Sequence, residues 1–239
     1  MYKIGIFDSG IGGLTVLNEI TKLLPNEDIL YYGDSKNNPY GNKSDEELLN
    51  ITKRIVEYFI NYECKIIVIA CNTATTRCIH HLRKMYPDII FVGTEPAIKV
   101  ACDHHSKSTL VLGTKATVTS ASVQKLIHEN KRENQTIYLE NCEGLAHAIE
   151  MQDEYTIHKI LEEHLLPYQD KEIDAVVLGC THYPYVGEEI LKYFKNATIY
   201  DGSIGVAKEV KRQLENHHLK KTKQTLGNVK IIDSIEKLN

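Results

Sequence analysis

The sequence lacks a long hydrophobic run. Its longest apolar stretches, such as residues 66–71, have only the length of a strand, whereas a membrane-spanning helix needs about 20 apolar residues. The N-terminus carries one lysine, Lys3, before a short strand-like run and a glycine-rich loop, which is not the pattern of a signal peptide. We therefore predict a cytoplasmic protein with no membrane partner.

Closely paired cysteines are also missing. The six cysteines are widely spaced, with no C-x-x-C pair and no combination of Cys and His at the spacing of a zinc site. We predict reduced cysteines and no bound metal ion. The adjacent histidines at 80–81, 104–105 and 217–218 are expected at the surface.

The chain has no excess of positive charge. It carries 28 Lys and Arg against 32 Asp and Glu, a net charge of -4 at pH 7. Proteins that bind nucleic acids usually show a basic patch, so no nucleic-acid partner is expected. The basic residues that do cluster, Lys220, Lys221 and Lys223, are predicted to form a solvated tail.

Short apolar, β-branched runs alternate with helix-like segments along the whole chain, which predicts an α/β fold with mainly parallel sheets. Ser44 and Glu47 have the spacing of a capping box that opens a helix. Strands are expected at residues 3–7, 29–33, 65–70, 89–92, 109–112, 136–139, 174–179 and 197–200. Helices are expected at residues 12–24, 44–61, 74–85, 120–129, 144–152, 154–166, 185–194 and 204–216.

The two halves of the chain contain similar segments. Residues 7–12 resemble residues 200–205, and residues 66–73 resemble residues 175–182. These similarities predict two related α/β domains whose sheets face each other across a cleft. The first domain would comprise residues 1–95 plus about 205–239, and the second residues 96–204.

Cys71 and Cys180 occupy matching positions in this pattern. Each follows a strand that reads as buried, and each precedes small hydrogen-bonding residues, Asn72-Thr73 and Thr181-His182, at an expected helix N-terminus. A helix N-terminus favours the thiolate form of a cysteine and can bind a carboxylate. From spacing alone a reactive pair and two ordinary buried cysteines are about equally supported. The other four, Cys64, Cys78, Cys102 and Cys142, are predicted to be structural.

Three further segments contain candidate binding residues. The loop at residues 8–13 has G-x-G-G spacing rather than G-x-G-x-x-G, and no Gly-Lys-Ser/Thr follows, so a small anionic ligand is favoured over a dinucleotide. Asp8 in this loop is either a helix cap or a group that holds an ammonium ion or tunes a thiol. Residues 38–42 read as a turn. The threonines at 114, 117 and 119 fit either a helix cap or a carboxylate site.

The motifs at residues 7–16, 39–41, 70–75 and 178–184 together resemble the aspartate/glutamate racemases. The resemblance extends from about residue 3 to about residue 210 and is closest to members that act on glutamate. It implies interconversion of L- and D-glutamate without a cofactor, which supplies D-glutamate for bacterial peptidoglycan. It also implies that glutamate is the partner and that a homodimer is possible.

The resemblance assigns roles to particular residues. Cys71 and Cys180 would exchange a proton with opposite faces of the substrate's Cα, with Asp8 beside Cys71 and with His182 and Glu150 beside Cys180. Two bases are needed because inversion requires an acid and a base on opposite faces. The substrate-binding positions that it implies are Asp8, Ser9, Pro39, Tyr40, Gly41, Asn72, Thr73, Thr114, Thr117, Thr119, Thr181 and His182.

Two stretches depart from the family pattern. The family's Cys-Pro before the catalytic glutamate is replaced here by Cys142-Glu143, which leaves Glu143 as a second candidate for the role of Glu150. The tail from about Leu219 does not match the usual family ending.

Other functions fit some of the same residues. An aspartate racemase or a related isomerase would use the same cysteines, because substrates that differ by one methylene differ by only about 1–3 kcal/mol in a pocket. A non-catalytic module that binds a dicarboxylate is a more distant alternative, since binding alone needs no thiols. A thiol-redox enzyme would usually carry a C-x-x-C motif.

Overall fold

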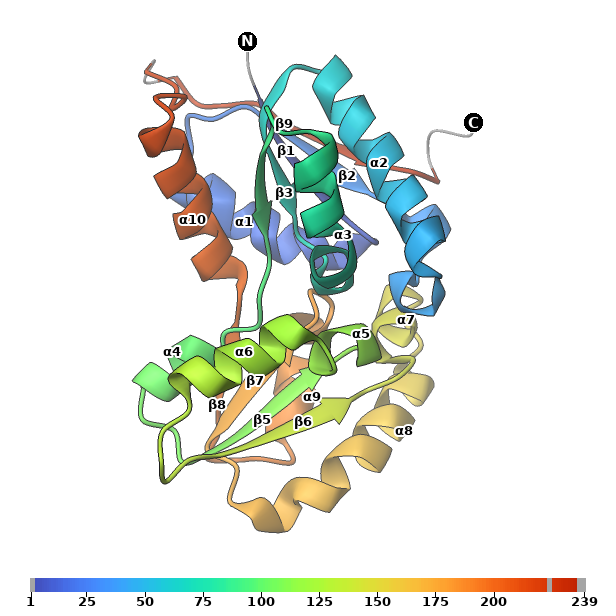
Figure 1. Cartoon of the computed structure of the whole chain (residues 1–239). Helices are drawn as coiled ribbons and strands as arrows, with labels where there is room; N and C mark the ends of the chain where they lie inside the picture. The colour runs from blue at the N-terminus through green and yellow to red at the C-terminus, as the bar shows by residue number, and fades with distance from the viewer. Residues whose placement is uncertain (1–2, 223–224, 236–239) are drawn as a thin grey trace. The chain divides into compact units, whose positions relative to one another are not determined.

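The computed structural model describes residues 3–222 and 225–235, which form two compact units. Unit 1 comprises Met1–Thr94 and Ser203–Asn239, and unit 2 comprises Glu95–Gly202 (Figure 1). The partition into two domains with boundaries near residues 95 and 205 stays a prediction.

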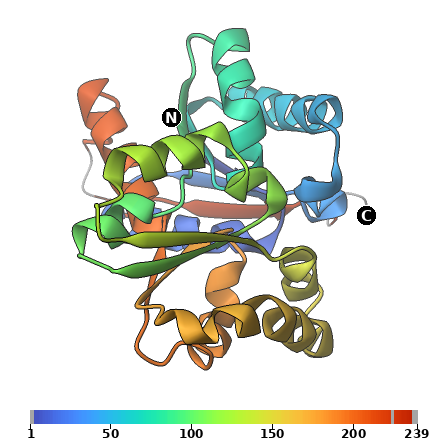
Figure 2. The ribbon, with the colours of Figure 1, turned by 60° about the horizontal axis from the view of Figure 1, so that its bottom comes forward.

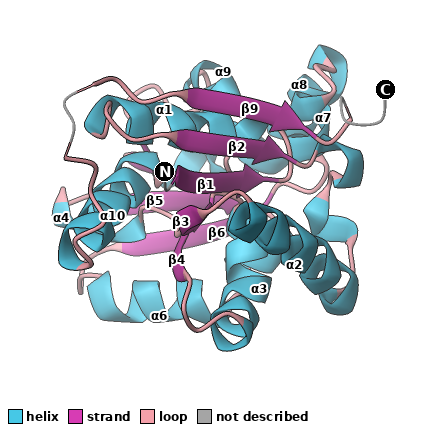
Figure 3. Cartoon of the chain, turned by 90° about the horizontal axis from the view of Figure 1, so that it is seen from above, coloured by secondary structure: helices cyan, strands magenta, loops and turns pink. Residues whose placement is uncertain are grey.

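Unit 1 is built on a five-stranded parallel sheet with the order β4-β3-β1-β2-β9 (Figure 3). Almost every residue of the three central strands is buried, as expected for parallel strands that are covered on both faces. The strands are β1 (Lys3–Asp8), β2 (Ile29–Gly33), β3 (Cys64–Ile69), β4 (Ile90–Gly93) and β9 (Val229–Asp233).

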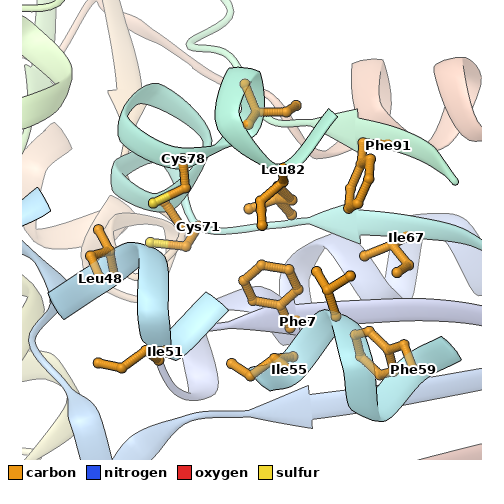
Figure 4. Close-up of a cluster of buried hydrophobic side chains, with 14 of the residues drawn as sticks. Phe7, Leu48, Ile51, Ile55, Phe59, Ile67, Cys71, Cys78, Leu82 and Phe91 are labelled. Atoms are coloured by element: carbon orange, nitrogen blue, oxygen red, sulfur yellow. The ribbon is translucent and has the colours of Figure 1, made fainter. Parts of the chain in front are cut away.

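Helices cover both faces of this sheet. On one face, α2 (Asp45–Asn61) and α3 (Asn72–Met85) pack on Phe7, Ile67 and neighbouring side chains (Figure 4). On the other, α1 (Leu14–Leu23) and α10 (Ser203–Asn216) pack against each other and on the sheet.

Unit 2 has the same architecture on a smaller scale. Its four parallel strands have the order β6-β5-β7-β8. They are β5 (Ser108–Gly113), β6 (Thr136–Asn141), β7 (Ala175–Gly179) and β8 (Thr198–Asp201). Within this unit, the green helices lie on one side of the sheet and the yellow and orange helices on the other (Figure 2).

The residues buried on each face identify these helices. Side chains of α4 (Ile98–Asp103) and α6 (Ala121–Asn130) cluster with Val111 and Val177 of the sheet. Side chains of α7 (Leu145–Glu150), α8 (Glu154–Leu165) and α9 (Gly187–Leu191) cluster with the opposite face. A four-residue helix, α5 (Lys115–Val118), follows β5, and 3-10 turns lie at Ile11–Gly13, Ser35–Asn37, Tyr40–Asn42, Leu166–Lys171 and Tyr183–Val186.

The α/β class with two parallel sheets is confirmed, and so is the cap on α2, where the Ser44 side chain accepts a hydrogen bond from the Glu47 backbone N–H at 3.2 Å. The sequence analysis missed α4, α5 and β9, because short helices and an edge strand carry little hydrophobic periodicity. The single helix expected at 185–194 is instead a 3-10 turn followed by α9.

The prediction of a solvated lysine tail is wrong for Lys221. Its side chain is only 12% exposed and pairs with Asp28 at 3.2 Å, and its backbone N–H donates to Glu27. Lys220 is exposed, as expected, and Lys223 lies outside the described residues. The segment after α10 therefore packs on unit 1 and does not extend into solvent. All six residues of the three histidine pairs are exposed, as predicted.

A buried ion pair holds this segment. The side chains of Lys65 and Glu27 are 5% and 2% exposed, with 2.5 Å between Lys65 Nζ and Glu27 Oε2. Lys65 Nζ also donates to the carbonyl of Leu219 at 2.7 Å, and the other Glu27 oxygen accepts from the backbone of Lys221. Removing one partner of such a pair leaves the other charge buried, with neither water nor its counter-charge around it.

We expect Lys65→Met to lower the free energy of unfolding by about 3–5 kcal/mol, because it leaves the Glu27 carboxylate buried without its cation. Lys22→Met is the matched control: Lys22 pairs with Glu19 but is 72% exposed, so its loss should cost less than about 1 kcal/mol. Urea denaturation followed by circular dichroism measures both. Equal losses in the two variants would contradict a structural role for the Lys65 pair.

Candidate active site

Cys71 lies just beyond the end of β3 and caps α3. It is buried, with 6% of its surface exposed, among side chains that include Phe7 and Leu48 (Figure 4). The first turn of a helix carries backbone N–H groups that have no partner within the helix, and a partial positive charge. The expected helix N-terminus after Cys71 is confirmed, and it can hold an anion beside the thiol.

Asp8 ends β1, the strand next to β3, and is fully buried. Its Oδ2 accepts a hydrogen bond from the backbone N–H of Gly10 at 3.1 Å. A Cβ added to Gly13 would lie 2.5 Å from the Cβ of Asp8, so the loop can pass this close to the carboxylate only with glycine at that position. The glycine-rich loop thus packs around Asp8, and Ser9 within it is also buried.

Tyr40 opens the turn that follows β2 and is almost completely buried. Its hydroxyl donates to Oδ2 of Asp34 at 2.7 Å. Burial, above all, and then the charge of Asp34 raise the pKa of Tyr40 well above its usual range, and smaller contributions come from Cys71 and Asp8. The phenol is therefore a neutral donor that lies close to the cysteine and the aspartate.

Asp34 is a buried residue that the sequence analysis did not assign to the site. Besides Tyr40, its carboxylate accepts hydrogen bonds from the side chains of Asn37 and Ser234, while burial raises its pKa. The only sequence signal was its position directly after a strand, in a Tyr-Gly-Asp string.

Three asparagine side chains have a buried oxygen without a hydrogen-bond partner among the described residues: Asn38, Asn72 and Asn141. All three lie at or after the carboxyl end of a strand, where α/β proteins bind ligands. Buried polar atoms are usually paired, so these oxygens mark places where a ligand donor fits. Asn72 had been predicted to bind substrate, whereas Asn38 and Asn141 had not.

Cys180 follows β7 in unit 2 and is 8% exposed. Its sulfur lies 4.0 Å from Nδ1 of His182. On the other side of the ring, Nε2 of His182 lies 2.6 Å from Oε2 of Glu150, whose side chain is 10% exposed. The structure thus brings these three predicted residues into one line of contacts.

Glu143, the second candidate for the glutamate role, is exposed, and the residue that contacts His182 is Glu150. Tyr183 is a further residue that the sequence analysis did not single out. It is fully buried, donates to the carbonyl of Cys142, and has a pKa that burial, and then the neighbouring Cys180, raise well above its usual range.

The expected helix N-terminus after Cys180 is not present. Thr181 and His182 form a turn, in which the backbone N–H of Tyr183 donates to the carbonyl of Cys180, and only a short 3-10 turn follows. Pro184 supplies no backbone N–H, and α9 begins only at Gly187. A helix therefore lies beside one cysteine of the pair, and an imidazole lies beside the other.

The three threonines after β5 differ in their surroundings. The hydroxyls of Thr114 and Thr117 lie 3.2 Å apart at the start of α5, and Thr117 is fully buried. Thr119 is exposed, and its hydroxyl donates to the carbonyl of Lys115 at 2.8 Å. The structure brings Thr114 and Thr117 together but not Thr119.

The remaining cysteines are buried side chains of the two cores, as Cys78 shows beside Cys71 in Figure 4. Burial raises the pKa of both Cys64 and Cys142 to about 12, and it also raises the pKa of Cys78 and Cys102. These thiols stay protonated near neutral pH. Among the described residues there is no group of three or more His, Cys, Asp or Glu that could hold a metal ion, and no helix long and apolar enough to cross a membrane.

Known proteins share this architecture and much of the sequence. The Asp/Glu/hydantoin racemase family matches residues 13–208. A glutamate racemase of Clostridium perfringens is 42% identical over 237 residues, which cover 98% of this chain and 91% of that protein.

Solved structures of glutamate racemases have the same fold as this chain. A glutamate racemase isoform of Bacillus anthracis has a TM-score of 0.82 at 30% identity and covers 97% of this chain and 87% of its own. A glutamate racemase of Francisella tularensis in complex with D-glutamate has a TM-score of 0.81 at 28% identity and covers 98% of this chain and 88% of its own.

The relatives and the solved neighbours are glutamate racemases, and at this identity and coverage they place the chain among the amino-acid racemases, which are isomerases. The chain belongs to the Asp/Glu/hydantoin racemase family.

Proposed function

We propose that the chain is a cofactor-independent glutamate racemase that interconverts L- and D-glutamate by moving the α-proton between two cysteines. The observation that carries this proposal is the equivalent placement of Cys71 and Cys180 beyond the ends of β3 and β7. The relatives named above support glutamate as the substrate, and one of them holds D-glutamate.

In the proposed reaction one cysteine enters as a thiolate and the other as a thiol. The thiolate takes the α-proton, so the Cα–H bond breaks, an S–H bond forms, and the electron pair moves into an enolate-like carboxylate. The second thiol then gives its proton to the opposite face of Cα and becomes a thiolate. By family resemblance Cys71 acts on D-glutamate and Cys180 on L-glutamate.

Unit 1 supplies groups that suit the α-amino acid end of the substrate. The first turn of α3 offers backbone N–H groups for the α-carboxylate, where negative charge grows as the proton leaves. The buried carboxylate of Asp8 and the unpartnered Oδ1 of Asn72 are acceptors for the ammonium group. Thr73 and Ser9 lie next to these residues in the sequence and complete the proposed contacts.

Unit 2 supplies a proton relay. His182 lies between Cys180 and Glu150, at 4.0 Å and 2.6 Å. The Glu150 carboxylate stabilises the positive charge of the imidazolium that forms when His182 takes a proton from Cys180. Thr181 is buried and lies between Cys180 and His182 in the sequence. Its hydroxyl is the proposed contact of this unit with the substrate.

Glutamate is favoured over aspartate by the sequence relatives. We propose that the side-chain carboxylate meets Thr114, Thr117 and the turn at residues 39–41, with Thr119 as a more distant contributor. The product D-glutamate would serve peptidoglycan synthesis, and a homodimer stays a prediction.

Racemisation is tested by deuterium wash-in. The dialysed enzyme in deuterated water should exchange the α-hydrogen of either glutamate enantiomer without added pyridoxal phosphate or metal, because both thiols exchange with solvent. Nuclear magnetic resonance measures the exchange, with L-aspartate as the parallel substrate. Binding without exchange would leave a dicarboxylate-binding module, and faster exchange into aspartate would move the assignment to an aspartate racemase.

The two cysteines are tested by serine substitution. Each Cys→Ser variant should lose racemisation by more than about 100-fold, because a hydroxyl is a poor base. Cys71→Ser should still remove the α-proton of L-glutamate, and Cys180→Ser that of D-glutamate. Glutamate enantiomers with a leaving group on Cβ report this, since elimination is irreversible and needs no reprotonation.

Cys64→Ser is the matched control, because Cys64 is a buried thiol whose pKa is raised to about 12, and it should keep full activity. Equal elimination from both enantiomers in both site variants would show that these cysteines are not the two bases.

Glu150→Gln should lower kcat/KM for both enantiomers by about 100-fold, because the amide cannot stabilise an imidazolium at His182. The effect must be equal in both directions, since the two enantiomers have equal free energies. Glu143→Gln, at an exposed position just before the start of α7, should leave kcat/KM within about twofold. Polarimetry that starts from either enantiomer measures both variants. A larger loss of kcat/KM in Glu143→Gln than in Glu150→Gln would assign the role to Glu143.

A further inference from the structure

Ser234, the residue after β9, contacts the chain between the end of β2 and Lys36, which precedes the turn that carries Tyr40. The backbone N–H of Ser234 donates to the carbonyl of Gly33 at 2.9 Å, and the side chain of Ser234 is only 7% exposed. Its Oγ accepts the backbone N–H of Lys36 at 2.9 Å and bonds to the carboxylate of Asp34. Because a carboxylate can only accept a hydrogen bond, the Ser234 hydroxyl is the donor to Asp34.

Asp34 in turn joins Ser234 to the proposed substrate site. Its backbone N–H donates to the carbonyl of Asp8 at 2.9 Å, which fixes it beside the end of β1. Its Oδ2 accepts the Tyr40 hydroxyl at 2.7 Å, and Asn37 donates to both carboxylate oxygens at 2.9 Å. The carboxylate therefore has a donor from the C-terminal segment on one side and the tyrosine on the other.

Tyr40 cannot donate its hydroxyl proton to a substrate while it donates that proton to Asp34. The turn at residues 40–42 can still meet a ligand through its backbone, and a Cβ built at Gly41 would touch no atom within 4 Å. The phenol acts as an anchor, and the position of this backbone depends on how firmly Asp34 is held.

We propose that Ser234 is a positioning residue for substrate binding, which orients Asp34 and through it the Tyr40 turn. This inference rests on the proposed function, because the turn is assigned to glutamate only there. The C-terminal segment departs from the family pattern in sequence. Under this proposal the segment contributes to the site that contains Asp34 and Tyr40.

The neighbouring Ser35 provides a matched control. Its hydroxyl donates to Oδ2 of Asp233 at 2.7 Å, so it joins the segment after β2 to the same strand through a different carboxylate. If the C-terminal segment matters only for fold stability, alanine at Ser35 and at Ser234 should act alike. If Ser234 positions Asp34, only its alanine variant should change substrate affinity.

The experiment measures kcat and KM for both glutamate enantiomers, with thermal unfolding of each full-length variant. Ser234→Ala should raise KM roughly tenfold, in keeping with the loss of one hydrogen bond to a charged group, and leave kcat within about twofold. Ser234→Thr should restore KM, and Ser35→Ala should leave it unchanged. Should the alanine variant not fold, Ser234→Cys, with a weaker donor of similar size, should give a raised KM in its place.

An unchanged KM in Ser234→Ala, a KM that rises equally in Ser35→Ala, or a loss confined to kcat would overturn the proposal. These outcomes presuppose an active wild type. An inactive wild type would overturn the proposed function itself.

Discussion

In both sheets, residues that end one strand lie beside residues that end the next, because parallel strands pair in a fixed register. Phe7 pairs with Ile69 in unit 1, so Asp8 and Cys71 follow at neighbouring strand ends. Gly113 pairs with Gly179 in unit 2, so Thr114 and Cys180 do the same. In each unit the proposed site residues are far apart in the sequence, so their proximity depends on this register.

The proposed site residues of unit 1 and those of unit 2 stabilise charge in different ways. In unit 1 the buried carboxylates of Asp8 and Asp34 are held by a loop N–H and by hydroxyl and amide donors, and the first turn of α3 adds backbone N–H groups. In unit 2 the carboxylate of Glu150 contacts the imidazole of His182, whose other nitrogen lies 4.0 Å from the sulfur of Cys180. For the proposed exchange of a proton between two thiols, unit 1 thus offers helix N–H groups beside its cysteine, and unit 2 offers an imidazole.

The segment after α10 connects stability to the site. At the amino ends of the strands, the Lys65–Glu27 pair and Lys221 fix the chain as it leaves α10. The chain then returns as β9 beside β2 and ends at the carboxyl edge, where Ser234 meets Asp34. Burial of the ion pair thus holds in place a strand that is followed directly by Ser234, the residue that bonds to Asp34.

The sequence by itself determined the α/β class and most of the strands and helices, because buried parallel strands and amphipathic helices have distinct periodicities. Spacing alone left Cys71 and Cys180 balanced between a reactive and a structural role, and the family resemblance selected them. The resemblance assigned the glutamate role to Glu150 but left Glu143 as a second candidate, because the choice depends on which of them contacts His182 in the fold. The sequence analysis also missed β9, α4, Asp34 and Ser234. An edge strand is defined by its partner, and β9 lies about 200 residues from β2 in the chain. Ser234 lies equally far from the carboxylate of Asp34 to which it bonds. Only the tertiary structure brings them together, because hydrogen bonds between distant segments leave no periodic pattern in the sequence.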